Sequence, residues 1–158
     1  EILGNRRTKI IESLNNNSSN TNNKDGMDMS LCKLNLKKKT LEFAGANNPL
    51  IHISNDQLEN IKGNSQPVGL SVIDNKPFTN HKIKLKKRDM IYIYSDGYQD
   101  QFGGPNGKKY MVKKYRIFLK ELSKLPIEEQ GVKIQEEFHS WKGNHDQVDD
   151  ICVMGLRV

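Results

Sequence analysis

The stretch from Met90 to Gly104, which reads MIYIYSDGYQDQFGG, constrains the fold more than any other part of the sequence. Its first five residues, Met90 to Tyr94, are apolar or aromatic and predict a strand that is buried on both faces. The strand is expected to stop at Ser95-Asp96-Gly97, because an acid followed by a glycine favours a turn. A carboxylate is therefore predicted where a buried strand meets solvent, a common location for functional groups.

A second stretch, Gln147 to Gly155 (QVDDICVMG), places two adjacent acids directly before another apolar segment. Residues 151–158 are predicted to form the final strand, with Asp149 and Asp150 at its amino-terminal end. If this strand pairs antiparallel with the first one, Asp96 and Asp149 come to the same edge of a sheet. Two carboxylates that lie together repel each other unless a cation separates them, and oxygen ligands suit Mg²⁺ or Mn²⁺ rather than zinc.

Five segments in this order resemble the bacterial SpoIIE-type serine/threonine phosphatases, a branch of the metal-dependent PPM (type 2C) phosphatases. They are DGMDMSLC (25–32), LEFAGANNPL (41–50), QPVGL (66–70), YSDGYQDQFGG (94–104) and QVDDICVMG (147–155). In the family, an acidic GD pair and a second DG-containing turn precede these segments, and this sequence contains neither. We therefore expect residues 1–158, which open with Glu1 and not Met, to be an excised portion or processed product. They would form a single domain that is the C-terminal half to two-thirds of a SpoIIE-like phosphatase domain.

The resemblance implies an α+β fold, a partial α-β-β-α sandwich of antiparallel β-sheets flanked by helices. It implies hydrolysis of phosphoserine or phosphothreonine on a protein substrate by a water activated between two Mn²⁺ or Mg²⁺ ions. Asp96 and Asp149 match the family's second-metal carboxylates and are the candidate catalytic residues. Asp150 is expected to orient the turn or bind a metal-bound water, and Asp100 matches an accessory metal position. The ligands of the other metal would lie in the absent part of the domain, so part of the site is missing here.

Hydrophobic periodicity predicts the remaining elements. Helices are expected over 1–14 and 110–125, and from Pro126 to Lys142. In the second of these, Met111, Tyr115 and Leu119 are expected on the buried face. Strands are expected over 27–36 and 41–46, which are candidates for a hairpin with three lysines, Lys37 to Lys39, at its tip. Further strands are expected over 50–53 and, as an exposed edge strand, 78–87. The Asn/Ser-rich residues 15–24 predict a mobile loop, and residues 56–63 are ambiguous. This order of elements, with short loops between strands, favours the α+β class.

Charge and composition leave two alternatives open. The chain carries a net charge of +6, and its basic clusters would suit a nucleic-acid-binding module. However, acidic side chains beside core strands would not help a protein to bind the phosphate backbone of a nucleic acid. No nucleic-acid partner is therefore expected. The second alternative is a non-catalytic protein-binding or regulatory domain that keeps the phosphatase fold. No apolar run approaches the ~18 residues of a membrane span, so no membrane contact by this segment is expected.

The residues that often carry other chemistry form no recognisable set. Cys32 and Cys152 lie in apolar stretches and are predicted to be small core residues, which fits a reducing, cytoplasmic location. Histidines are scattered, and only His145 lies near the candidate acids. Asp25 and Asp28 are weaker acidic candidates, and the arginines are predicted to be surface residues. The expected partner is a phosphoprotein substrate, and an upstream sensor domain and oligomerisation through an exposed strand edge are compatible with the sequence.

Overall fold

A computed structural model of the chain describes residues 26–69 and 76–158. The predicted helix over 1–14, the predicted loop over 15–24 and Asp25 lie outside the described residues. The chain divides into two compact units: unit 1 contains Glu1–Leu50 and Asn60–Lys86, and unit 2 contains Ile51–Glu59 and Lys87–Val158. Both helices and antiparallel sheets are present, which confirms the predicted α+β class.

Unit 1 is built on a three-stranded sheet with the order β2-β3-β7. Strands β2 (Met29–Asn35) and β3 (Thr40–Ala46) form the predicted hairpin, from Met29 opposite Ala46 to Asn35 opposite Thr40. Strand β7 (His81–Lys84) is shorter than predicted but lies at the edge of the sheet, as expected. Two short strands, β1 (Gly26–Met27) and β6 (Val68–Gly69), pair with each other.

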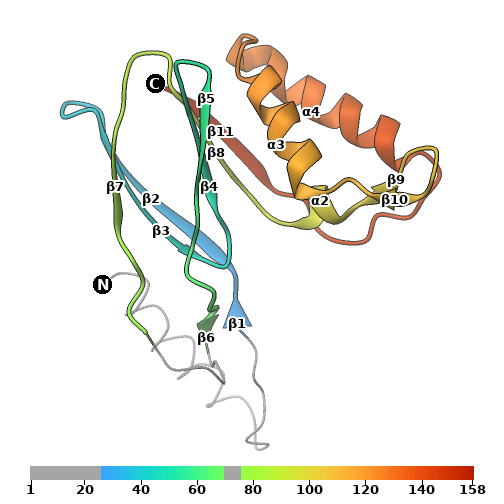
Figure 1. The fold of residues 1–158 in the computed structure, drawn as a ribbon, viewed down its shortest axis with the longest axis horizontal. Coiled ribbons are helices and arrows are strands. Elements are labelled where there is room, and N and C mark those ends of the chain that lie inside the picture. The colour runs from blue at the N-terminus through green and yellow to red at the C-terminus, as the bar shows by residue number, and fades with distance from the viewer. Residues whose placement is uncertain (1–25, 70–75) are drawn as a thin grey trace, which may run out of the picture. The chain divides into compact units, whose positions relative to one another are not determined.

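The sheet of unit 2 has the order β11-β8-β4-β5 (Figure 1). It comprises β4 (Leu50–Ser54), β5 (Gln57–Ile61), β8 (Met90–Tyr94) and β11 (Val153–Arg157). Strand β8 is almost entirely buried, as predicted. The ambiguous segment 56–63 contains β5, which a two-residue turn joins to β4. Both turn residues, Asn55 and Asp56, have positive φ angles (49° and 60°), as a type I′ hairpin turn requires.

Two helices, α3 (Val112–Leu122) and α4 (Ile127–Lys142), pack against this sheet through a shared core that includes Tyr92, Tyr115 and Phe138 (Figure 1). Met111 does not join this core and is 60% exposed, so its predicted burial was wrong. It precedes the first helical residue, and its φ of 75° takes it off the helical periodicity. Among the described residues, no helix is long and apolar enough to cross a membrane.

Both cysteines are exposed, which corrects their predicted place in the core. Cys32 lies on β2, at the edge of its three-stranded sheet, and Cys152 lies directly before β11, at the edge of the four-stranded sheet. An edge strand has a neighbour on one side only, so apolar residues beside a thiol do not ensure that the thiol is covered.

Candidate functional site

The candidate acids lie on two segments at one end of the β8–β11 pair. These strands pair antiparallel, with Val153 opposite Tyr94 and Arg157 opposite Met90, as the sequence had suggested. Asp96 follows the end of β8, and Asp149 precedes the start of β11. The topology therefore brings both acidic segments to the same end of the strand pair.

Hydrogen bonds of Ser95 and a close approach at Gly97 hold the two acidic segments together. The Ser95 amide donates to the carbonyl of Cys152 at 3.0 Å. The Ser95 hydroxyl donates to the Asp150 carbonyl at 3.0 Å and accepts from the Cys152 amide at 2.9 Å. A Cβ atom at Gly97 would lie only 2.5 Å from the Asp150 carbonyl oxygen, so this close approach requires glycine. Ser95 and Gly97 thus fix the distance between the two segments.

The segment predicted as a simple turn at 95–97 is the start of a short helix, α2 (Gly97–Asp100). The Asp96 carbonyl accepts from the amide of Asp100 at 3.0 Å, which closes this helical turn. The Asp96 side chain is exposed and makes no capping hydrogen bond to α2. Its carboxylate oxygens therefore remain available to a ligand.

Asp149 is also exposed, and its own turn holds it. Its Oδ1 accepts from the Asp150 amide at 2.7 Å, and its carbonyl accepts from the side-chain amide of Gln147 at 2.8 Å. The interaction engages Oδ1, and no partner of Oδ2 is found among the described residues. Asp150 interacts with Asp149 through its backbone amide.

Two other acids named from the sequence, Asp100 and Asp28, have partners of their own. The Asp100 carboxylate lies 3.1 Å from Lys109 Nζ, and Asp28, in unit 1, accepts from Asn47 Nδ2 at 2.7 Å. Within residues 26–69 and 76–158, no three His, Cys, Asp or Glu side chains are grouped to hold a metal ion. Asp96 and Asp149 both carry carboxylate oxygens, the donor type that Mg²⁺ and Mn²⁺ prefer.

Gln101 contributes to the site in a way that the sequence did not reveal. Its side chain is fully buried, and its Nε2 donates to the Asp146 carbonyl at 2.8 Å. Its Oε1 accepts from the Val148 amide at 3.3 Å, and its own carbonyl accepts from Trp141 Nε1 at 3.1 Å. One buried amide thus anchors the segment that leads to Asp149. The only signal in the sequence was its position within YSDGYQDQFGG.

The family model described as Stage II sporulation protein E (SpoIIE) matches residues 3–158. The chain belongs to the SpoIIE family. The resemblance drawn from the five sequence segments is confirmed.

Solved structures show that this SpoIIE-family chain has the fold of PP2C phosphatase domains. The SiaA-PP2C domain of Pseudomonas aeruginosa matches with a TM-score of 0.87 and 24% identity, over 99% of this chain and 59% of that chain. The phosphatase domain of SpoIIE from Bacillus subtilis, presoaked with Mn, matches with a TM-score of 0.60 and 19% identity, over 94% of this chain and 64% of that chain. RsbX in complex with magnesium matches with a TM-score of 0.58 and 16% identity, over 100% of this chain and 76% of that chain.

The chain spans 59% of the SiaA-PP2C domain and 64% of the Mn-presoaked SpoIIE phosphatase domain. It has no significant match among curated proteins.

Proposed function

We propose that this chain is part of a single SpoIIE-like domain that hydrolyses phosphoserine and phosphothreonine on a protein substrate, dependent on Mn²⁺ or Mg²⁺. One observation carries the proposal: Ser95 and Gly97 fasten the Asp96 and Asp149 segments together at one end of β8 and β11. Membership of the SpoIIE family and the PP2C fold support the phosphatase class. Structures of two neighbours, one presoaked with Mn and one in complex with magnesium, support the choice of ion.

In this proposal, Asp96 and Asp149 hold a divalent cation through carboxylate oxygens. When bound, Mn²⁺ or Mg²⁺ supplies the Lewis-acid chemistry that makes water a nucleophile near neutral pH. The described residues fit part of such a site, since both acids are exposed and offer only hard oxygen donors. Asp150 keeps Asp149 in place through its backbone amide, and Ser95 keeps the two segments in register. Further ligands would come from outside the described residues.

The test is turnover of phosphoserine and phosphothreonine peptides by the intact protein as Mn²⁺ is titrated. Asp96→Asn and Asp149→Asn each remove a negative charge but keep the shape of the side chain. Each should lower turnover by more than ~100-fold. This exceeds the ~10–100-fold loss expected when a residue that only supports a metal ligand is changed. Asp146→Asn is the matched control, because Asp146 is exposed on the same segment and no contact of its carboxylate is found among the described residues.

Two outcomes would count against the proposal. If Asp96→Asn kept full activity, these acids would not hold the metal. If the folded protein bound the peptides without hydrolysing them in Mn²⁺, the non-catalytic binding domain would replace the enzyme.

A further inference from the structure

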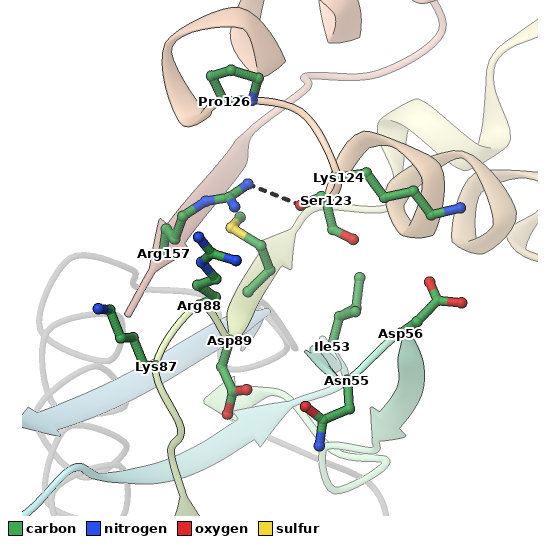
Figure 2. A pocket seen from close by; sticks show the side chains of 11 residues that line it. Ile53, Asn55, Asp56, Lys87, Arg88, Asp89, Ser123, Lys124, Pro126 and Arg157 are labelled. Carbon is green, nitrogen blue, oxygen red and sulfur yellow. Dashed lines mark hydrogen bonds between the residues drawn. The ribbon is translucent and has the colours of Figure 1, made fainter.

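Unit 2 also contains a pocket of about 590 Å³ at the end of β8 opposite Asp96 (Figure 2). Its walls come from the turn before β8, the β4–β5 hairpin, the α3–α4 connection and the end of β11. Pockets that hold small molecules typically measure ~300–1,000 Å³, so the size suits a small organic ligand. The candidate phosphatase site uses none of the residues that line this pocket.

Positive charge dominates the pocket. Four basic side chains line it, Lys87, Arg88, Lys124 and Arg157, against two acids. An anion that enters would therefore meet an excess of cationic groups, and partial exclusion of water strengthens this attraction.

Both acids of the pocket already have partners. The Asp89 carboxylate is 2% exposed and lies 2.8 Å from His52 Nε2. The Asp56 carboxylate lies 3.2 Å from Lys120 Nζ, which is outside the pocket lining. These interactions occupy the negative groups. Lys124 is also paired, at 2.7 Å from Glu121 Oε2, so Lys87, Arg88 and Arg157 are the basic side chains that determine what binds.

Arg157 is held rigidly, although the sequence predicted it as a plain surface residue. It is half-buried, and its Nη2 donates to the Ser123 carbonyl at 2.9 Å (Figure 2). The same nitrogen donates to the Leu125 carbonyl at 2.5 Å. These neutral acceptors orient the guanidinium group but carry no full negative charge to cancel it. A cation that is fixed before binding loses little freedom when an anion arrives.

Arg88 lies on the turn that leads into β8, with a left-handed φ of 73° that is uncommon for arginine. Its amide donates to the Val158 carbonyl at 2.7 Å, which fixes the turn, while its side chain is exposed. No ion pair of Arg88 is found among the described residues. Two buried apolar residues, Ile53 and Met90, line the same pocket.

The geometry points to a binding site for a small organic phosphate in this pocket. The phosphate group binds Arg88 with Lys87 and Arg157, because a guanidinium fork matches the oxygens of a phosphate. The organic part of the ligand packs against the exposed ring of Pro126, because Ile53 and Met90 are 4% and 1% exposed and offer little surface. The site lies at the other end of β8 from Asp96, so the ligand binds without occupying the candidate metal ligands.

Calorimetry on the intact protein in EDTA tests this site, because EDTA removes divalent cations from the candidate phosphatase site. The probes are phenylphosphonate and adenosine 5′-monophosphate, with benzyl alcohol and adenosine as uncharged counterparts. We expect at least one phosphorus-containing probe to bind, and its uncharged counterpart to bind at least 10-fold more weakly. Arg88→Gln should weaken binding at least 10-fold, and Arg88→Lys should weaken it less.

Lys113→Gln is the control, since Lys113 is an exposed basic residue on α3 outside the pocket. This variant should bind like the wild type. Thermal unfolding without ligand should be the same for Arg88→Gln and the wild type, which separates lost binding from lost folding. The inference is overturned if neither probe binds at millimolar concentration, if the uncharged counterparts bind equally well, or if Arg88→Gln binds like the wild type.

Discussion

At the scale of single residues, Ser95 has the most specific role, because its hydroxyl bonds both to the Asp150 carbonyl and to the Cys152 amide. Ser95→Ala removes both hydrogen bonds and lets the two acidic segments separate. We expect the concentration of Mn²⁺ needed for half-maximal activity of the intact protein to rise about 10-fold. This is the loss typical of changes to residues that support a metal ligand without contacting the metal. Turnover at saturating Mn²⁺ should largely recover, because the carboxylates themselves remain.

Two further variants make the Ser95 prediction specific. Ser95→Thr keeps the hydroxyl and should restore the Mn²⁺ dependence of the wild type. Ser123→Ala removes a serine hydroxyl that donates to the Lys120 carbonyl at the end of α3, and should leave the Mn²⁺ dependence unchanged. Equal Mn²⁺ curves for Ser95→Ala and the wild type would show that this hydroxyl does not position the acids.

The two adjacent acids Asp149 and Asp150 should differ in their effect on activity. Asp150 assists Asp149 through its backbone amide, which a side-chain substitution does not remove. Asp149→Asn should therefore lower Mn²⁺-dependent phosphopeptide turnover far more than Asp150→Asn, by at least 10-fold between the two. Equal losses, or the reverse order, would mean that Asp150 is the ligand.

At the scale of elements, a cluster of tyrosines joins β8, α2 and α3. The ring of Tyr115 stacks on Tyr98, with ring centroids 4.4 Å apart, and meets Tyr94 edge-on at 4.9 Å. Burial, and then the neighbouring tyrosines, raise the pKa of Tyr115 well above its usual value of 10. The folded state therefore keeps the proton, while the unfolded state releases it as the pH rises above about 10.

Because the unfolded state binds fewer protons above about pH 10, the free energy of unfolding should fall there, by up to about 1.4 kcal/mol per pH unit for each such tyrosine. Tyr115→Phe removes one of these groups, so stability should fall less steeply at alkaline pH. At pH 7 the variant should be about as stable as the wild type, because the Tyr115 hydroxyl is buried without a partner among the described residues. Urea unfolding at pH 7 and at pH 10.5–11.5 measures both effects.

Tyr98→Phe is the matched comparison. Its hydroxyl donates to the Ile134 carbonyl at 3.1 Å, so its loss should cost about 1 kcal/mol at pH 7. If Tyr115→Phe lowered the free energy of unfolding at pH 7 more than Tyr98→Phe, the Tyr115 hydroxyl would have a hydrogen-bond partner after all.

The elements with strong local patterns could be predicted from the sequence. A run of five apolar residues identified β8, and apolar residues at helical spacing identified α3 and α4. The β2–β3 hairpin followed from alternation around three lysines. In the hairpin and the helices the period indicates both the element and its buried face, except at Met111, which precedes α3.

What the sequence missed depends on contacts between distant residues or on turn geometry. Strand β5 was left ambiguous because the Asn55–Asp56 turn that starts it was not recognised. The roles of Ser95 and Gln101 depend on backbone groups between Asp146 and Cys152, which no local pattern reveals. The cysteines were misplaced because an apolar stretch does not show whether its strand is at an edge.

At the scale of the whole molecule, β11 is the edge strand of its sheet among the described residues, and it exposes two apolar side chains. Met154 is 61% exposed and Leu156 is 38% exposed. An unpaired apolar edge invites pairing with another chain. We expect the 158-residue chain to self-associate, and Met154→Lys to shift it toward monomer, because a charge on an edge strand opposes such pairing.

Light scattering after size-exclusion chromatography measures this association. Val132→Lys is the control, since Val132 is 56% exposed but lies on α4, away from the strand edge. A monomeric wild-type chain, or equal dissociation by both variants, would exclude association through β11.

The last prediction concerns the activity of the 158-residue chain by itself. Two carboxylates hold Mg²⁺ or Mn²⁺ loosely, because these ions are bound tightly only by fuller ligand sets or with help from phosphates. The described residues provide no group of three ligands, and the chain spans 59% of the SiaA phosphatase domain that it resembles. We therefore expect the chain to bind Mn²⁺ weakly in calorimetry and to hydrolyse phosphopeptides little or not at all.

Turnover comparable to that of the intact protein, dependent on Mn²⁺ and abolished by Asp96→Asn, would contradict this expectation. It would mean that Asp100 or a residue outside the described ranges completes the site.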